Sequence, residues 1–591
     1  MSELGPAGDS RAIVLPTTQQ LDVVERQSGH VEAVSRFRWL RPFWRILASP
    51  YRELPPMPRG RWPRIALALV TVLALAFVVY YTAYTWSLLD TFRSNAEDMG
   101  IMDQALWNTL HGAILHQTIC NSISDTNCLG DVSRFAIHFE PLMLPLSLLY
   151  LIAPTPKALM LLQMLVVASG VYPVFWIACR RLSSPLAGLI FAVAYLLYPQ
   201  LQSAILFDFH AVTLTMAFLV FAIYFMLTRN NVGLLISCVL ALSTKEEVPL
   251  DIVMIGLAIL LFQRRWRLGA GVIGLSLAWL AMAVIVMHIA SPVGHSPTAA
   301  RYGYLGDNPI QAGIYIVTHP LQVLREEMLD DAGISYLSIL LGAFSFLGFA
   351  SPFTLVLCLP SLSINLLSSD ANMHQGLHQY SAEIVPIMVF SAISGIALVL
   401  ELVALGHRRY ILAPDAFSNL RKQIGYSFAR LRLKTPSVSR VALVALLAIA
   451  FAGCLVQQRT MNLGNPPTFL ALAWPTATSH SNVGNTVVAM IPADASVSAQ
   501  NALVPHLSHR RYIYQYPYGA EQSDYVVLDT AGFIYPFTDQ HAYDQSVRDL
   551  QSSGHFRTVF ARDGYLVLQR ATPGLQKTSA TPRVLASRSI G

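Results

Sequence analysis

The stretch Ile65–Leu89 reads IALALVTVLALAFVVYYTAYTWSLL and determines the class of fold. It carries no charged residue and exceeds the roughly 20 apolar residues that cross a bilayer as a helix. Arginines accumulate before it, and by the positive-inside rule they place the N-terminus in the cytoplasm. We therefore expect this helix to carry the chain outward. The arginines are Arg36, Arg38, Arg41, Arg45, Arg52, Arg59, Arg61 and Arg64.

The composition of the whole chain agrees with a multi-pass membrane protein. Of its 591 residues, 54% are hydrophobic and only 13% are charged, whereas about a quarter of the residues in a soluble chain are charged. The net charge of +6 comes from short Lys and Arg clusters between apolar segments. These clusters determine topology and do not indicate nucleic-acid binding. No cleavable signal peptide is evident, because a long polar segment precedes the first apolar run.

Alternating apolar segments and basic clusters predict an α-helical membrane protein with about eleven transmembrane helices in the plasma membrane. The segment His138–Ala153 is interrupted by prolines, and we expect it to be re-entrant or interfacial. If it crossed, the basic pair Arg180-Arg181 would fall on the outer side. The predicted crossings are Ile65–Leu89, Ala158–Ala178, Leu186–Gln200, Phe207–Leu227, Val232–Ser243, Val248–Phe262, Leu268–Ile289, Tyr336–Ala350, Phe353–Leu367, Ile384–Leu405 and Val441–Val456.

Four regions follow from this pattern. Residues 1–63 are expected to be a disordered cytoplasmic tail, and residues 64–457 a transmembrane domain with an outer loop at 90–136. Residues 458–570 are expected to form a small extracytoplasmic α/β domain, followed by a disordered tail at 571–591. Within the α/β domain we expect strands at Ala495–Ala499, Arg511–Tyr516 and Asp524–Asp529, a helix at Thr538–Gln551, and a hairpin over Thr558–Gln569 that turns at Asp563-Gly564.

The six cysteines fall into two groups. Cys120 and Cys128 share the polar loop 90–136, and a disulfide between them is expected if that loop lies outside the cytoplasm. The others lie in or beside apolar spans, where a cysteine is usually a small core residue. These are Cys179, Cys238, Cys358 and Cys454.

The stretch Asn95–His111, NAEDMGIMDQALWNTLH, follows the first span directly. Its acidic pair Glu97-Asp98 is held close to the bilayer, where acids do not help insertion. The residues after it have helical spacing and favour a helix on the membrane surface. The alternative is an ordinary solvated acidic loop. The residues with helical spacing are Ile101, Ala105, Leu106 and Leu110.

Other ionisable residues fall at the outer ends of the predicted spans. Placing them at the edge of the hydrocarbon is costly, so each is a candidate for a functional site. Several also have a structural alternative: a helix cap for His138, a loop tether for Asp208 and His210, a self-neutralising ion pair for Lys245 with Glu246 or Glu247, and an interfacial belt for Tyr380. The candidates are His138, Asp208, His210, Lys245, Glu246, Arg301, His378 and Tyr380.

A metal site is not expected. His374 and His378 are four residues apart, which suits a metal on a helix. However, Gly376 weakens that helix, and no third ligand lies nearby. A cofactor is not required by these residues, and a divalent cation stays open as an alternative.

Several of these motifs resemble a bacterial and archaeal family of multi-pass membrane proteins that carries a domain-of-unknown-function label. The resemblance covers residues 64–570. Two motifs depart from the family pattern: Phe-Asp-Leu-Gly becomes Glu97-Asp98-Met99-Gly100, and Lys-Glu-Asp becomes Lys245-Glu246-Glu247. The matching motifs are Glu97-Asp98-Met-Gly-x-x-Asp103-Gln-Ala-Leu-Trp107, His138-Phe-x-Pro141, Asp208-Phe-His210, Lys245-Glu-Glu and His378-x-Tyr380-Ser-Ala.

The family is similar in layout to the GT-C membrane glycosyltransferases, which use polyprenyl-phosphate sugars as donors. The resemblance implies Asp98 as the catalytic carboxylate, with Glu97 or Asp103 as a helper. Lys245 and Arg301 would then hold the donor phosphate, because transfer from a lipid phosphate needs a base for the acceptor and cations for the leaving group. The expected partners are membrane lipid and a polyprenyl-phosphate-linked sugar. His138 or His378 would orient donor or acceptor.

Two other functions compete with this hypothesis. Broken helices near Lys245 and Pro249 suit a transporter or flippase, whose site lies near the middle of the membrane. The chain could also be a non-enzymatic membrane protein whose outer domain binds a partner. An enzyme needs its polar residues gathered at one face, whereas a transporter needs them near the midplane.

Overall fold

The computed structural model describes residues 48–123, 128–306, 308–412, 435–461 and 473–571. It divides the chain into two units, Met1–Pro50 and Tyr51–Gly591. The membrane helices, the sheet and the candidate site belong to the second unit. Most of the predicted N-terminal tail, almost all of the predicted C-terminal tail and the basic segment Arg421–Lys434 lie outside the described residues.

Among the described residues, six helices are long and apolar enough to cross a membrane, or seven if a bent pair forms one span. The bent pair is α8 (Pro185–Leu196) and α9 (Pro199–Leu206), which meet at 40°. The break falls at Pro199, which lacks a backbone N–H. The six are Trp62–Asp90, Pro156–Arg181, Ala211–Thr228, Trp266–Ala290, Val385–Ala404 and Ser439–Thr460.

The prediction of about eleven crossings is not confirmed. Four of the predicted spans correspond to apolar helices that are shorter than a span: Asn231–Leu242, Val248–Leu261, Asp331–Gly342 and Pro352–Leu366. Periodicity and hydropathy locate such helices correctly, but the sequence does not reveal that turns and prolines shorten them.

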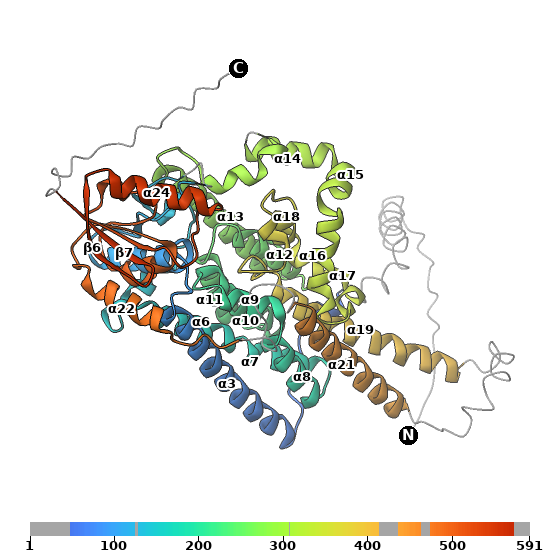
Figure 1. Cartoon of the computed structure of the whole chain (residues 1–591). Helices are drawn as coiled ribbons and strands as arrows, with labels where there is room; N and C mark the ends of the chain where they lie inside the picture. The colour runs from blue at the N-terminus through green and yellow to red at the C-terminus, as the bar shows by residue number, and fades with distance from the viewer. Residues whose placement is uncertain (1–47, 124–127, 307, 413–434, 462–472, 572–591) are drawn as a thin grey trace, which may run out of the picture. The chain divides into compact units, whose positions relative to one another are not determined.

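The elements of the helical part are shown in Figure 1. Its longer helices are α3 (Trp62–Asp90), α6 (Pro156–Ser169), α7 (Val171–Arg181), α10 (Thr215–Thr228), α11 (Asn231–Leu242), α12 (Val248–Leu261), α13 (Trp266–Ala290), α14 (Pro309–Thr318), α16 (Asp331–Gly342), α18 (Leu359–Leu366), α19 (Val385–Leu412) and α21 (Thr435–Thr460). Short helical turns connect them: η1 (Ser49–Tyr51), η5 (Ala211–Leu214), η6 (Pro297–Leu305), α15 (Pro320–Gln322), η7 (Val323–Met328), η8 (Leu347–Ala350), α17 (Pro352–Leu355), η9 (Val356–Cys358) and η10 (Ala371–His374).

The segment predicted to be re-entrant forms two short pieces, α5 (Met143–Ser147) and η4 (Leu148–Leu151). Neither is long enough to cross a membrane. The backbone N–H of Leu142 donates to the carbonyl of Ser243 at 2.9 Å, so this segment is attached to the turn between α11 and α12.

The C-terminal domain contains a five-stranded sheet in the order β4-β3-β5-β7-β6. β3 is parallel to β4 and β5, whereas β7 is antiparallel to β5 and β6. The predicted strands, helix and hairpin are all present, and the hairpin turns at Asp563-Gly564, both at positive φ. The sequence prediction missed α22. The elements are α22 (Ser479–Met490), β3 (Val497–Ala499), η13 (Asn501–Leu503), α23 (Val504–Leu507), β4 (Ile513–Gln515), η14 (Ala520–Gln522), β5 (Tyr525–Asp529), α24 (Gln540–Ser552), β6 (Phe556–Arg562) and β7 (Tyr565–Arg570).

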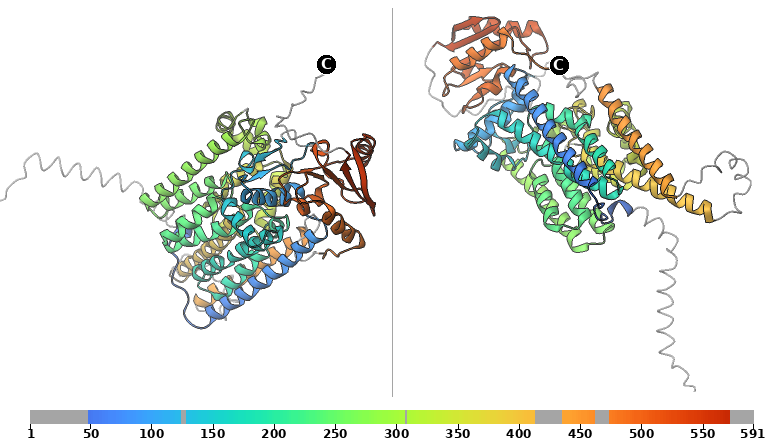
Figure 2. Two further views of the ribbon diagram at one scale, coloured as in Figure 1. Left: turned by 90° about the vertical axis from the view of Figure 1, so that its left-hand side faces the viewer. Right: turned by 90° about the horizontal axis from the view of Figure 1, so that it is seen from below.

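The sheet is covered on both faces, and it lies at one end of α3 in Figure 2. α24 packs on one face through Tyr543 and Val547. The other face buries α22 together with three residues from far earlier in the chain, Ala96, Ile101 and Ile119. The outer loop therefore supplies part of the hydrophobic core of the C-terminal domain.

The predicted surface helix exists, and three of its four residues with helical spacing are buried against protein. η2 (Ala96–Gly100) and α4 (Ile101–Leu110) follow α3. Ile101 is buried against the C-terminal domain, and Ala105 and Leu106 are buried against α5 and α6. Helical spacing identified the apolar residues correctly, but their partners are protein. The remaining elements of this loop are β1 (His116–Gln117), β2 (Val132–Ser133) and η3 (Arg134–Ala136).

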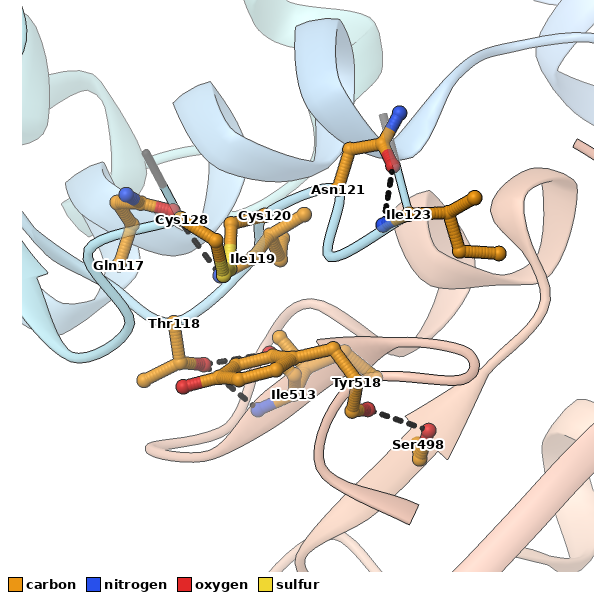
Figure 3. Close-up of a disulfide and its surroundings, with 10 residues drawn as sticks. All are labelled: Gln117, Thr118, Ile119, Cys120, Asn121, Ile123, Cys128, Ser498, Ile513 and Tyr518. Atoms are coloured by element: carbon orange, nitrogen blue, oxygen red, sulfur yellow. Dashed lines mark hydrogen bonds between the residues drawn. A yellow bond between two sulfur atoms is a disulfide. The ribbon is translucent and has the colours of Figure 1, made fainter. Parts of the chain in front are cut away.

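The predicted disulfide is confirmed. Cys120 and Cys128 are bonded, with Cα atoms 5.4 Å apart. The residues before Cys120 lie along β4, where Thr118 Oγ1 accepts from the N–H of Ile513 at 3.1 Å (Figure 3). The disulfide therefore lies beside a segment that is docked on the C-terminal domain.

We expect reduction of this disulfide, or the Cys120→Ser/Cys128→Ser variant, to lower the free energy of unfolding by roughly 2–3 kcal/mol. A cross-link that closes a short loop lowers the conformational entropy of the unfolded chain, and this stabilises the folded state by about that amount. Thermal unfolding in detergent, with and without reductant, measures the change. The variant should match the reduced wild type, and equal stability of the oxidised and reduced wild type would contradict the expectation.

Candidate functional site

The acidic turn after the first span is η2, one turn of π-helix over Ala96–Gly100 that carries Asp98. The N–H of Ala96 donates to Asn501 Oδ1 at 2.9 Å. Asn501 Nδ2 donates to Asn95 Oδ1 at 3.0 Å. Single π-helical turns are frequent at functional sites. Here the C-terminal domain holds the turn in position.

Asp98 and His210 form the centre of the candidate site. Asp98 Oδ1 lies 3.1 Å from His210 Nε2. The other ring nitrogen, Nδ1, lies 3.1 Å from the carbonyl of Phe207. A carbonyl can only accept, so Nδ1 carries a proton, and Nε2 must share a second proton with Asp98 for the contact to be a hydrogen bond. Gln163 fixes the backbone by accepting from the N–H of His210 at 3.1 Å.

A second carboxyl, Asp208, lies beside this pair and differs from it in environment. Its side chain is buried, and its Oδ2 accepts from the N–H of Asn95 at 2.9 Å. Burial, reinforced by the negative charge of Asp98, raises the pKa of Asp208 to about 7. A buried carboxyl with such a raised pKa, placed beside a second carboxyl, suits a role in proton transfer.

We expect the Asp208→Asn variant to be more stable than wild type at pH 8. The folded-state pKa is raised, so wild type loses stability as the pH rises from about 4 to about 7. A shift of this size corresponds to at most roughly 4 kcal/mol. Asparagine removes the charge and tolerates the positive φ of this position.

Unfolding of wild type and Asp208→Asn should be measured between pH 4 and pH 8. The two proteins should converge at pH 4 and diverge as the pH rises. Asp90→Asn is the matched control, because Asp90 is an exposed carboxylate near the same turn. Parallel curves for wild type and Asp208→Asn would contradict the expectation.

His378 completes this group. Its N–H donates to Ser203 Oγ at 2.9 Å, and its ring lies 3.9 Å from that of Phe207, measured between centroids. Burial is the main cause that lowers the pKa of His378, opposed by the charge of Asp98. Within the described part of the chain, its buried Nδ1 has no hydrogen-bond partner. A neutral imidazole with a free nitrogen can receive a hydroxyl group of a ligand.

The turn between α11 and α12 forms a second polar group. Lys245 Nζ contacts Glu247. Glu246 is held from two sides: Oε1 lies 2.8 Å from His138 Nδ1, and Oε2 accepts from the N–H of Phe139 at 3.0 Å. The turn thus combines a buried cation with two carboxylates, and it fixes the segment that contains His138.

Tyr380 connects the two groups. Its phenol is within electrostatic reach of Arg301, Asp370, Lys245 and Asp98, and burial raises its pKa while Arg301 opposes the shift. Arg301 itself forms an ion pair with Asp370 at 3.1 Å. In the described residues, no hydrogen bond or ion pair joins Asp98 directly to Lys245. The polar groups are neighbours around Tyr380.

Asp103, predicted as a catalytic helper, has a structural role in the folded chain. It is fully buried and accepts hydrogen bonds from the hydroxyls of Tyr150 and Ser508. His509 Nε2 lies 3.1 Å from its Oδ2. These contacts connect α4 with the C-terminal domain, so Asp103 lies in an interface between the two parts.

Glu97, the other predicted helper, is directed to a different partner from Asp98. Its carboxylate lies within electrostatic reach of the hydroxyl of Tyr535 in the C-terminal domain. Of the three acids considered for catalysis, Asp98 is therefore the one paired with a histidine of the site.

Sequence reasoning missed Gln163, Asn501 and Tyr535. Gln163 could have been found, because a buried amide inside an apolar span is itself a signal of function or of hydrogen bonding. Asn501 and Tyr535 carry no such signal. Their roles depend on contacts across about 400 residues of chain.

A cavity of about 300 Å³ lies beside this site, near Arg301. His374 belongs to its lining, and the N–H of Ser369, also in the lining, donates to the carbonyl of Arg301 at 3.0 Å. Asp98, His210 and Lys245 are not part of the lining. The lining residues are Tyr304, Glu327, Asp330, Gly333, Leu366, Ser368, Ser369 and His374.

Within the described ranges, no group of three or more His, Cys, Asp or Glu side chains is arranged to hold a metal ion. The ion pairs above satisfy the carboxylates with protein cations and histidines instead.

A family model described as "Predicted membrane protein (DUF2079)" matches residues 88–567. No curated protein matches the chain.

Proposed function

Because this chain belongs to the family described as "Predicted membrane protein (DUF2079)", whose description states no activity, we propose a function from the site itself. The protein is a membrane glycosyltransferase of GT-C type that moves a sugar from a polyprenyl-phosphate donor. The observation that carries the proposal is the proton-sharing pair of Asp98 and His210. It lies at the end of a membrane helix and beside the partly neutral carboxyl of Asp208.

The chemistry follows from these residues. Asp98, supported by His210, takes the proton from an acceptor hydroxyl. The hydroxyl oxygen bonds to the anomeric carbon, and the bond from that carbon to the phosphate oxygen breaks. Polyprenyl phosphate leaves with the bonding electrons. His378 Nδ1 is available to orient a sugar hydroxyl.

The donor phosphate needs cations, and Lys245 and Arg301 supply them near Tyr380. Each already holds a carboxylate, Glu247 and Asp370 respectively. The donor phosphate therefore has to displace these carboxylates from the two cations or share the cations with them. His138 and Glu246 fix the neighbouring segment and do not contact the donor in this proposal.

The depth of the Lys245 turn supports a lipid-linked donor. α11 has 12 residues and α12 has 14, which gives lengths of roughly 18 and 21 Å. The hydrocarbon core is about 30 Å thick. If the basic ends of this hairpin lie at one edge of the core, the turn lies on the order of 10 Å inside the other edge. A lipid-attached phosphate can reach such a position from the side.

The same depth favours a second candidate, a transporter or flippase. Glu383 before α19 is buried within electrostatic reach of Lys245, and Asp251 on α12 is buried within reach of Glu383. Buried acids at depth are typical of pathways for protons or ions. The transporter remains second, because the Asp98 and His210 pair lies at the end of a span and not along its middle.

The test is an assay of the purified full chain in liposomes with radiolabelled polyprenyl-phosphate sugars. An enzyme releases polyprenyl phosphate and yields a labelled acceptor. A flippase moves label between leaflets and leaves the sugar on its lipid. Both functions would be rejected if no donor gave either a labelled product or movement of label between the leaflets.

The proposal also requires the C-terminal domain to lie outside the cytoplasm. We expect protease added to right-side-out spheroplasts to release a fragment that contains β3 to β7, whereas inverted vesicles should protect it. The reason for this expectation is the excess of arginine before α3, which places the N-terminus in the cytoplasm. Cleavage only in inverted vesicles would reverse the topology and reject a donor on the outer leaflet.

A further inference from the structure

The connection between α13 and α16 contains three consecutive helical segments, α14, α15 and η7, at residues 309–328. We call these segments the arm, and α14 and α15 lie at the margin of the helical part in Figure 1. Five apolar side chains of the arm are exposed, and they recur every three or four residues, which is the spacing of one face of a helix. This apolar stripe consists of Ile310, Ile314, Val317, Leu321 and Leu324, which are 76%, 58%, 78%, 74% and 42% exposed.

The arm packs against the rest of the protein through a different face. Val323 is buried in a cluster with Leu305 and Leu367, and Tyr315 and Ile316 pack against this cluster. These residues alternate along the chain with the members of the stripe. The apolar stripe is therefore turned away from the protein.

A third face of the arm is polar and exposed. Each of its residues directly follows a member of the stripe, and successive residues of an α-helix are about 100° apart around the axis. One edge of the arm is therefore polar, whereas the side opposite the protein is apolar. A helix with such faces suits the boundary between lipid and water. The polar residues are Gln311, Thr318, Gln322 and Arg325.

The orientation of the arm is fixed by its N-terminal end. The hydroxyl of Tyr304 donates to the carbonyl of Leu367 at 3.0 Å, which attaches η6 to the end of α18. Asn308 Oδ1 accepts from the N–H of Ile310 at 3.1 Å and so caps α14. Gly306 has a φ of +154°, and a Cβ there would lie 2.9 Å from a backbone nitrogen in the first turn of α14. The turn into the arm is therefore tight, and it determines which face points outward.

The parts of the chain on either side of the arm indicate what covers the stripe. α13 is long and apolar enough to cross a membrane, and only 22% of its apolar window is buried inside the protein. Ile285 and Ile289 near its end are 57% and 76% exposed, and Ile334 at the start of α16 is 51% exposed. Exposed apolar residues thus continue along the chain from a membrane helix, through the arm, to the next apolar helix. Contiguous exposed apolar surface of this kind marks an interaction site, and here it continues from a surface that faces lipid.

We propose that the arm lies in the membrane interface, where its apolar stripe contacts the acyl chains of lipids and its polar edge lies among their headgroups. Such helices bury their apolar face about 5–10 Å into this boundary. The arm also begins and ends at the cavity described above, because Tyr304 precedes the arm, Glu327 belongs to its last segment, and both line the cavity. The cavity is then held at the level of the lipid headgroups. This inference does not depend on the proposed sugar transfer.

The test is EPR power saturation of spin-labelled full chain in liposomes of phosphatidylethanolamine and phosphatidylglycerol. The labelled variants are two pairs of neighbours, Val317→Cys with Thr318→Cys and Leu321→Cys with Gln322→Cys. The native cysteines are disulfide-bonded or buried, and labelled wild type gives the background. Oxygen concentrates among acyl chains, whereas a neutral nickel chelate stays in water. We expect oxygen to relax the first label of each pair more strongly, and the nickel chelate the second.

Two further variants calibrate the measurement. Ile285→Cys on α13 is the lipid reference, and Arg548→Cys on α24 is the water reference. Size-exclusion profiles identify folded variants, and either pair decides the result if a member of the other does not fold. Labels at Val317 and Leu321 that behave like the label at Arg548 would overturn the proposal. Low accessibility of these labels to both reagents would also overturn it, because protein would then cover the stripe, and dipolar broadening would identify a second copy of the chain.

Discussion

Replacing Asp98 by asparagine is expected to lower the rate of sugar transfer at least a hundredfold, the usual effect of losing a general base. Asparagine has the shape of aspartate but cannot take a proton from the acceptor. It can still face His210 Nε2, which lies 3.1 Å from the carboxylate. We therefore expect the fold to be kept and the chemistry to be lost.

The assay compares transfer by wild type, Asp98→Asn and Asp90→Asn under saturating donor. Asp90 is a carboxylate near the same turn, 58% exposed and paired with Lys157, so its variant should transfer at the wild-type rate. Thermal unfolding should show that both variants are folded. An Asp98→Asn protein with full activity would reject the enzyme and favour the transporter.

Replacing Lys245 by methionine is expected to have the largest effect on stability. Lys245 pairs with Glu247, and both side chains are mostly buried, at 10% and 17% exposed. Removing one partner of a buried ion pair leaves the other charge without compensation, which typically costs about 3–5 kcal/mol. Glu383 lies within electrostatic reach of the same ammonium group.

The double variant Lys245→Met/Glu247→Gln is the informative control. It removes both charges of the pair, so it should recover much of the stability that Lys245→Met loses. Thermal unfolding of the detergent-solubilised chain measures all three proteins. If Lys245→Met alone unfolds at the wild-type temperature, the lysine is solvated and cannot serve as a buried phosphate cation.

The sequence predicted local features well and long-range ones poorly. The strands, the hairpin at Asp563-Gly564 and the disulfide of Cys120 depend on neighbours in the chain, so turn residues and spacing were sufficient. The face of α4 was also identified correctly, but its partner was not. An apolar stripe on a helix indicates that this face is buried, but it does not specify whether lipid or protein covers it.

The same difference between local and long-range features applies to the residues of the candidate site. His210 and Lys245 were selected because ionisable side chains at the ends of membrane spans are energetically costly. The structure places both among buried charges. The sequence assigned Asp98 as the catalytic carboxylate only by resemblance and kept Asp103 as a helper, because the partners that separate the two acids, His210 and Ser508, are distant in the chain. Tyr535 illustrates the limit, since its proximity to Glu97 exists only in the folded chain.

The interlocking of the first loop with the last domain has a consequence for biogenesis. Ala96, Ile101 and Ile119 are made early but find their core partners, such as Val487 and Val527, only when the chain is almost complete. At about 5–20 residues per second, a ribosome needs on the order of 20–80 seconds to cover this distance. A nascent or truncated protein therefore inserts its helices while its acidic turn is still unsupported, so activity cannot precede the end of translation.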